Sequence, residues 1–260
     1  MQWITQKENR SIITNQIPIT LIRVKLDSKP SDITFRISST TLPGNGRESH
    51  TYRELRELSY MGATVLHEDA VFPVRSAGIP INIRNTNRPE DEGTMIVSHS
   101  AGYDSEHVIT GVAGKKGFSV LTIEKDSMNS EVGFGRKVLE VFEENEISFE
   151  HLPSGIDTMS VVVATATLDG RREKVMNAIV RAVKPDSVFI EDELALIAVV
   201  GRGMVKAKGT SARVCDALAR ADINIRIIDQ GSSELNIIVG VDDEEYEDAL
   251  RAIYSEFVKA

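Results

Sequence analysis

The chain repeats itself at a constant offset of 76 positions, and this repeat constrains its fold more than any other feature. Met128 is matched by Met204, and Gly133 is matched by Gly209. The offset holds without insertions, so the sequence predicts two copies of one small folding unit. Further identical pairs are Val138 and Val214, Ile147 and Ile223, Gly155 and Gly231, and Val163 and Val239.

Each copy carries the same order of strand and helix signals: an apolar run, a loop that ends in glycine, an amphipathic helix, two strand-like segments and another amphipathic helix. The pattern is βαββα, and a fourth strand nearby would complete an antiparallel sheet with both helices on one face. The other face would remain available for pairing. The first copy has the run 118–123, the stripe Phe134, Val138, Val141 and Phe142, strands at 147–149 and 159–163, and a helix with Val175, Ile179 and Val183. The second has 194–200, then Val214, Cys215 and Leu218, then 223–228 and 235–239, and finally Tyr246, Ala249, Leu250 and Ile253.

Composition excludes several classes of protein. With 260 residues, 41% of them hydrophobic, the chain is long enough for two or three compact domains. The net charge of −9 argues against nucleic-acid binding, which needs clustered Lys and Arg. The single cysteine, Cys215, excludes an intrachain disulfide and a cysteine-based zinc site. Neither a membrane-spanning run nor a signal-peptide pattern is recognised, so we expect no membrane partner and a cytoplasmic location.

A different segment precedes the repeats. Tyr52, Leu55, Leu58 and Met61 fall on one helical face, and short strands follow at 81–83 and 94–97. The polar, glycine-bearing stretch at 98–106 is typical of a linker. We therefore place a domain boundary there.

Long motifs in both parts resemble aspartokinases. The segments YRELRELSYMGATVLH at 52–67, GIPINIRNT at 78–86 and GT at 93–94 resemble the end of the aspartokinase catalytic domain. The segments GRGM at 201–204 and QGSSE at 230–234 resemble the tandem ACT domains of that family. The resemblance covers about residues 50–258, and its motifs are long enough to be specific.

The resemblance implies an α+β fold with two ferredoxin-like βαββαβ ACT domains in tandem, preceded by a fragment of an amino-acid-kinase α/β domain. In the family the first ACT unit is inserted within the second, so we expect the strand around 108–112 to pair with the 194–200 strand. The implied domains are an unmatched segment at 1–49, the catalytic-domain fragment at 50–98, a first ACT domain at 118–186, and a second ACT domain made of 107–117 and 187–260.

Catalysis is expected to be absent from this chain alone. Phosphoryl transfer needs a cradle of backbone N–H groups, a cation on the phosphates and carboxylates for magnesium. Residues 1–49 do not resemble the phosphate-binding start of aspartokinases, and they contain two possible strands at 17–26 and 32–37. The segment GVAGKKG at 111–117 lacks the Walker spacing and leads into a strand. We therefore predict no catalytic residue, metal site or cofactor here; Mg-ATP is a substrate of the full-length family.

The first copy offers an amino-acid site. A ligand carboxylate suits the N–H groups and positive dipole end at a helix N-terminus, and glycines allow the backbone to approach it closely. Glu150 and Asp157 are candidate acceptors for an ammonium group, which favours lysine. Phe134 lies on the apolar stripe, so core packing explains it equally well. By resemblance, the effector-binding positions are Met128, Ser130, Gly133, Phe134, Gly135, Glu150, Gly155, Ile156 and Asp157.

The second copy has equivalent positions with a different charge. Ile225 and Arg226 replace the acidic residue, so this copy is less suited to a diamino acid. Dimer packing or a threonine-type site is the expected role. The equivalents are Thr210, Asn224, Gln230 and Ser232.

The predicted function is the C-terminal regulatory region of an aspartokinase, an ATP:L-aspartate 4-phosphotransferase, sensing lysine or threonine for feedback control of the pathway from aspartate to lysine, threonine and methionine. We expect a homodimer through the ACT domains, because edge strands and uncovered sheet faces favour pairing. The alternative is a free-standing amino-acid-binding subunit that partners a separate catalytic chain.

Overall fold

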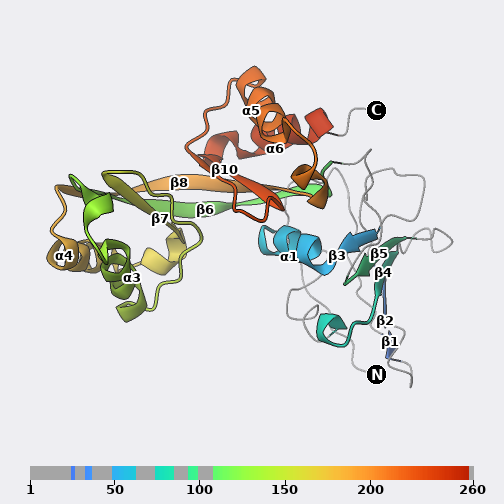
Figure 1. The fold of residues 1–260 in the computed structure, drawn as a ribbon, viewed down its shortest axis with the longest axis horizontal. Coiled ribbons are helices and arrows are strands. Elements are labelled where there is room, and N and C mark those ends of the chain that lie inside the picture. Colours follow the sequence, from blue (N-terminus) through green and yellow to red (C-terminus); the bar gives the residue numbers. More distant parts are fainter. Residues whose placement is uncertain are drawn as a thin grey trace.

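The computed structural model of the protein describes residues 25–26, 33–36, 49–62, 74–84, 93–98 and 108–257. These residues form two sheets of five strands each (Figure 1). The motif end at 63–67, the loop at 85–92 and the linker at 99–106 lie outside the described residues. None of the helices within these ranges is long and apolar enough to cross a membrane.

The first sheet belongs to what we call the upstream module, residues 25–98. Its strands run in the order β1-β2-β4-β5-β3, with β2 parallel to β4 and β3 parallel to β5. Of the two strands predicted at 17–26 and 32–37, residues 25–26 form β1 and residues 33–36 form β2, and the rest of both predicted ranges lies outside the described residues. Tyr52 and Leu55 of helix α1 are buried in the module's core, as the helical stripe predicts. The elements are β1 (Lys25–Leu26), β2 (Ile33–Arg36), β3 (Ser49–Thr51), α1 (Tyr52–Tyr60), β4 (Ile81–Arg84) and β5 (Thr94–Val97).

The second sheet has the order β7-β6-β8-β10-β9 and contains both repeats. All of its neighbouring strands are antiparallel. Its strands are β6 (Gly111–Glu124), β7 (Thr158–Ala164), β8 (Ser187–Val200), β9 (Ile227–Asp229) and β10 (Asn236–Asp242). Its helices are α3 (Phe134–Glu144), α4 (Arg172–Val183), α5 (Thr210–Arg220) and α6 (Tyr246–Phe257), with short 3₁₀ helices η1 (Met128–Ser130), η2 (Thr165–Leu168), η3 (Arg202–Val205) and η4 (Asp243–Glu245).

Two long strands join the repeats. Strands β6 and β8 each have 14 residues, and they pair from Gly111 opposite Val200 to Glu124 opposite Ser187, with register shifts near Phe118. Strands β6 and β8 thus form a two-stranded ribbon, and one half of it belongs to each repeat. We call residues 118–193 the first unit, and residues 108–117 with 194–257 the second unit. The predicted domain division between 186 and 187 stays a prediction; β8 begins immediately after it, at Ser187, and belongs by its first half to the first unit.

The start of β6 supplies the fourth strand of the second unit. Val112 lies opposite Val199 and Ala113 opposite Ala198, so the segment that follows 108–110 pairs with the 194–200 strand, as expected from the family. The fourth strand of the first unit is the N-terminal half of β8. In the view of Figure 1, α3 and α4 lie below the ribbon of β6 and β8, and α5 and α6 lie above it.

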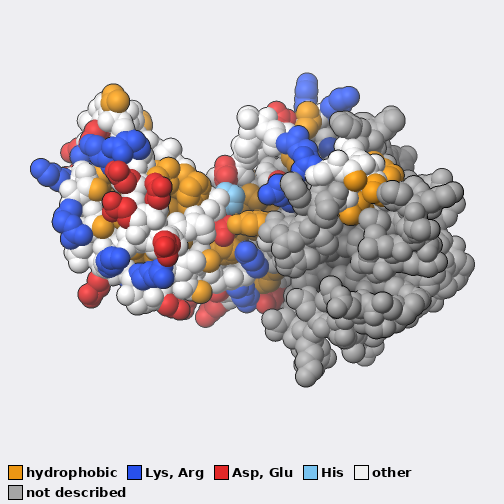
Figure 2. Space-filling model, turned by 90° about the horizontal axis from the view of Figure 1, so that it is seen from below, with side chains coloured by type: hydrophobic (Ala, Val, Ile, Leu, Met, Phe, Trp, Pro, Cys, Tyr) orange, Lys and Arg blue, Asp and Glu red, His pale blue; other side chains and the backbone are white. Residues whose placement is uncertain are grey.

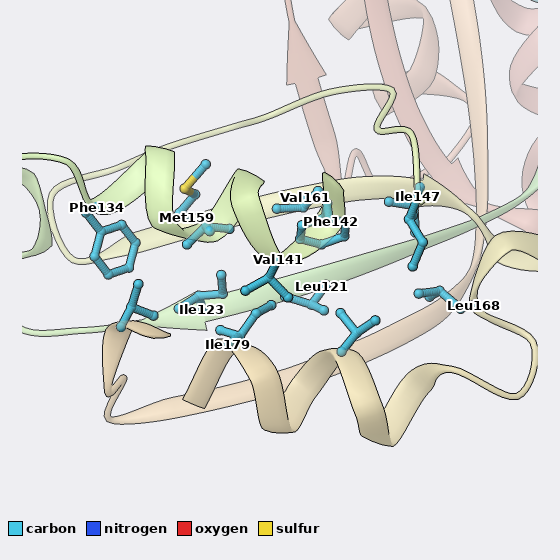
Figure 3. Close-up of a cluster of buried hydrophobic side chains, with 14 of the residues drawn as sticks. Leu121, Ile123, Phe134, Val141, Phe142, Ile147, Met159, Val161, Leu168 and Ile179 are labelled. Atoms are coloured by element: carbon cyan, nitrogen blue, oxygen red, sulfur yellow. The ribbon is translucent and has the colours of Figure 1, made fainter. Parts of the chain in front are cut away.

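Both predicted helix stripes face cores of their own unit. In the first unit, Val138, Val141 and Phe142 of α3 pack with Ile179 of α4 against Leu121 of β6 (Figure 3). In the second unit, Val214 and Leu218 of α5 pack with residues of α6 against β8 and β10. Each pair of helices therefore covers one face of its part of the sheet, as the sequence predicts.

The predicted strands at 147–149 and 223–228 are wrong in position. Glu146 and Asp222 both adopt left-handed backbone conformations, with φ of 55° and 59°, and turn the chain so that Ile147 and Ile223 cap the preceding helices with their N–H groups. The edge of the first unit is formed instead by isolated bridges at 151 and 154. Pro153 between them has no N–H to donate to a ladder.

The face of the second sheet that carries no unit helices is partly covered by α1. Leu58 of α1 and Met61, which caps the end of this helix, join a cluster with Phe118, Leu196 and Ile238. The sequence predicts that this face is open for pairing, and the structure shows that α1 covers part of it. The fit is close, because a Cβ added at Gly62 would lie 2.9 Å from the Gly114 carbonyl oxygen.

Candidate functional site

A hollow of about 390 Å³ opens at the N-terminal end of α5. Gly209, with φ of +87°, precedes the helix, and Thr210 begins it with its hydroxyl donating to the Ala207 carbonyl at 2.9 Å. The first N–H groups of a helix have no acceptor within the helix and carry the positive end of its dipole. The hollow therefore suits an anionic group such as a carboxylate. It is lined by Met204, Ala207, Gly209, Thr210, Ser211, Gln230, Gly231, Ser232 and Glu234.

The opposite wall of this hollow comes from the turn between β9 and β10. The Ser211 hydroxyl donates to Gln230 Oε1 at 3.1 Å and links the two walls. Glu234, held at φ of 51°, is the lining residue that carries a charge. An ammonium group could bind its carboxylate while a carboxylate binds the helix end, which is the charge pattern of a free amino acid.

Three of the four residues predicted for the second copy line this hollow: Thr210, Gln230 and Ser232. Asn224 is exposed and is not among the lining residues. The sequence reasoning missed Met204 and Glu234. Met204 could have been found because it is the repeat partner of Met128. Glu234 corresponds to Thr158 in the first copy, so the repeat gives no sign of an acid.

In the first unit the equivalent loops are joined by hydrogen bonds. The Lys125 N–H donates to the Asp157 carbonyl at 2.8 Å, and the Ser127 N–H donates to the Asp157 carboxylate at 2.7 Å. The Asn129 N–H donates to the Ile156 carbonyl at 3.0 Å. Asp157 was predicted to accept a ligand ammonium, and in this structure its carboxylate holds the two loops together.

The other predicted acceptor in the first unit, Glu150, has a partner in α1. Its Oε2 accepts a hydrogen bond from the Tyr60 hydroxyl at 2.6 Å. A donor 90 positions away could not be expected from the local sequence.

The remaining predicted residues of the first unit are divided between core and surface. Met128 and Phe134 are buried in the first-unit core, so packing explains Phe134. Gly133 adopts φ of +84° before α3, while Gly155 and Ile156 are exposed. The Ser130 hydroxyl donates to the Ser127 carbonyl at 2.8 Å, and a Cβ added at Gly135 would meet the Met159 side chain at 3.9 Å.

A carboxylate between two lysines lies beside α3. Glu131 Oε1 accepts from Lys137 at 2.7 Å, and its other oxygen pairs with Lys125. Hydrogen bonds from Lys125 and Lys137 lower the pKa of Glu131 to about 2. Figure 2 shows the first unit at the left, with acidic and basic side chains interspersed over the face in view. Within the described ranges, His, Cys, Asp and Glu side chains form no group that could hold a metal ion.

The pairing and helix placement of both units define a tandem of ferredoxin-like domains. A family model described as ACT domain matches residues 197–257, within the second unit. This is therefore an ACT-domain protein with an upstream module.

Comparison with known relatives shows which ACT-containing proteins this chain resembles. The chain is 43% identical to aspartokinase 3 of Bacillus subtilis over 208 residues, which are 80% of this chain and 45% of that protein. The crystal structure of Clostridium acetobutylicum aspartate kinase matches with a TM-score of 0.76 and 51% identity, over 81% of this chain and 48% of that one. The chain is thus homologous to the C-terminal part of aspartokinases, and it spans less than half the length of these relatives.

One similar structure is a shorter protein. A chain from the crystal structure of aspartokinase alpha and beta subunits matches with a TM-score of 0.50 and 21% identity. The match covers 57% of this chain and 98% of that one. At this identity the likeness concerns the fold alone.

Proposed function

We propose that this protein senses a free amino acid and regulates aspartokinase activity. The observation that carries the proposal is the hollow at α5, because the N-terminus of a helix and the acidic residue Glu234 both line one small space. These groups complement the carboxylate and ammonium of an α-amino acid. Polar, uncharged lining at Thr210, Ser211 and Gln230 favours a small polar side chain such as that of threonine. Lysine remains the proposed ligand of the first unit through Glu150.

The test is isothermal titration of the chain with L-threonine, L-lysine and L-methionine separately. We expect saturable threonine binding that Glu234→Gln weakens about tenfold, since the variant loses a charge-assisted hydrogen bond. Glu193→Gln is the matched control, because Glu193 is another exposed glutamate at positive φ, 58°, outside the lining of the hollow. Absence of binding by all three amino acids would overturn the proposal. Threonine binding that Glu234→Gln leaves unchanged would place the ligand elsewhere.

The regulated enzyme is proposed to be an aspartokinase that contains this region or a separate catalytic chain that binds it. A shorter chain of the same fold exists in the structure of aspartokinase alpha and beta subunits, so a separate regulatory chain is compatible with this fold. Co-purification with a longer kinase chain would favour a separate subunit.

We also propose a homodimer through the ACT units. Sedimentation equilibrium that returned only the monomer mass at micromolar concentration would contradict this.

A further inference from the structure

Helix α1 carries a fully buried carboxylate where the upstream module meets the second unit. Glu54 is 0% exposed. Its Oε2 accepts from the N–H and the hydroxyl of Thr51, both at 2.7 Å, in a capping box that begins the helix. Its Oε1 accepts from the Thr110 hydroxyl at 2.5 Å and from the Arg202 N–H at 3.3 Å. A buried charge is tolerated only when hydrogen bonds offset its desolvation, so this position is tightly specified.

The balance of these effects keeps Glu54 ionised. Burial raises the pKa of Glu54, and hydrogen bonds from Thr110, Thr51 and Arg202 outweigh it, so the pKa of Glu54 lies below its ordinary value. Arg202 Nε lies 3.9 Å from Oε1 and adds an ion pair.

The Arg202 N–H belongs to η3, the short helix that contributes Met204 to one wall of the α5 hollow. Arg202 begins η3, and Met204, two residues later, lines the hollow. Gly201 allows this wall to pass close to the start of the second unit, because an added Cβ would lie 2.5 Å from Ile109 Cα. Movement of η3 therefore acts directly on Glu54.

The opposite wall of the hollow is tied to the same helix one turn further on. Asn236 Nδ2 donates to Glu57 Oε2 at 2.8 Å. Asn236 begins β10, two residues after Glu234, which lines the hollow. Residues three apart lie on one face of a helix, so Glu54 and Glu57 point toward the second unit together.

The other side of α1 belongs to the upstream module. Tyr52 and Leu55 are buried in the core formed by β4 and β5, and the Tyr52 hydroxyl donates to the Ile79 carbonyl. A nine-residue helix thus contributes side chains to both cores. Among the described residues, a change in the spacing of the two walls can reach the upstream module by moving or releasing this helix.

We propose that Glu54 and Glu57 are positioning residues that couple the α5 hollow to the upstream module through helix α1. The proposal rests on the proposed function for its natural ligand, but the coupling is a property of the chain itself. An occupant that contacts both walls changes their separation, and the two glutamates transmit that change. Coupling of this kind requires that the occupant interact differently with two arrangements of the walls.

The experiment measures amide hydrogen exchange of the full chain by mass spectrometry, without any ligand. Ser211→Trp fills the hollow with a bulky side chain, and Ser255→Trp places the same side chain on an exposed position of α6. We expect Ser211→Trp to change exchange in α1, residues 52–60, by about fivefold or more. Ser255→Trp should leave α1 unchanged.

The same hydrogen-exchange measurement is then repeated with each of the two glutamates substituted. In Glu54→Gln and in Glu57→Gln backgrounds, the response of α1 to Ser211→Trp should be lost. An Arg56→Gln background should keep it, because Arg56 is an exposed residue of the same helix. Thr110→Val, which removes one donor to Glu54 and keeps the carboxylate, serves as a second variant should Glu54→Gln fail to fold. Unchanged exchange in α1 on filling the hollow, or a response that survives the glutamate and threonine variants, would overturn the proposal.

A separate experiment measures hydrogen exchange in α1 with saturating L-threonine. If threonine binds and produces the same α1 response, both the coupling and the proposed function are supported. If threonine does not bind while Ser211→Trp still acts through Glu54, the threonine assignment fails and the coupling stands. Bound threonine with unchanged exchange in α1 would overturn the coupling alone.

Discussion

The Tyr60 hydroxyl of α1 donates a hydrogen bond of 2.6 Å to Glu150 in the first unit. The same helix reaches the second unit through Glu54 and Glu57, so it contacts both repeats. Lys115 Nζ, 5.0 Å from the centre of the Tyr60 ring, adds a cation–π contact at this junction. This helix of the upstream module thus contacts both repeats.

Tyr60→Phe should strengthen lysine binding to the first unit. If Glu150 accepts the ligand ammonium, the Tyr60 hydroxyl competes for the same carboxylate, and its removal should tighten binding about threefold. Titration of wild type and variant with L-lysine measures the change. Tyr254→Phe is the control, because Tyr254 is also an exposed tyrosine, on α6. Equal or weaker lysine affinity in Tyr60→Phe would argue that Glu150 does not bind the ammonium.

Two glycine substitutions should shift stability in opposite directions. An alanine Cβ at Gly201 would lie 2.6 Å from the Val108 carbonyl oxygen as well as against Ile109, so Gly201→Ala should destabilise the protein by about 1–3 kcal/mol. Gly135 lies within α3, and an added Cβ there would meet only the Met159 side chain at an ordinary 3.9 Å. Gly135→Ala should stabilise by about 0.5–1 kcal/mol. Urea unfolding of both variants checks the signs; a stabilised Gly201→Ala would contradict the packing.

The repeated pattern and its helices were predictable because they depend on local periodicity. Val138, Phe142 and Val214 lie on buried helix faces as their spacing indicates. The edge segments were misplaced because a single left-handed residue, Glu146 or Asp222, delays the strand after each helix, and apolar content alone does not reveal a turn.

The candidate site was predicted less completely, for a physical reason. Residue type showed which carboxylates could accept a ligand, but not whether they already had partners. Asp157 is held by a backbone N–H, and Glu150 by a tyrosine from the upstream module. Glu54, whose burial depends on contacts 56 and 148 positions away, carries no local signal that distinguishes it from a helix-capping glutamate.

Arg172→Lys should weaken the first unit although it keeps the charge. Both terminal nitrogens of Arg172 donate to Asp192 at 2.8 Å, and hydrogen bonds from Arg172 and Ser119 lower the pKa of Asp192. Lysine cannot reproduce the two-pronged contact, so a loss of about 0.5–1 kcal/mol in the free energy of unfolding is expected. Arg251→Lys, in the highly exposed pair with Asp248, is the control and should change little. Equal stability of Arg172→Lys and wild type would show that the paired hydrogen bonds from Arg172 to Asp192 contribute nothing measurable to the free energy of unfolding.

Glu131 should make stability depend on acid pH. Its pKa of about 2 in the folded protein lies below the ordinary value of 4.5, so folding favours the ionised carboxylate. The stabilisation is therefore fully present above about pH 4.5 and is lost as the pH falls through about 2. Glu131→Gln should be less stable than wild type at pH 7, and the difference should shrink steadily between those two values. Urea unfolding across this range measures it, with Glu140→Gln as the control, because Glu140 forms an exposed pair with Arg136 on α3. A difference that stays constant with pH would mean that Lys125 and Lys137 do not hold Glu131 ionised.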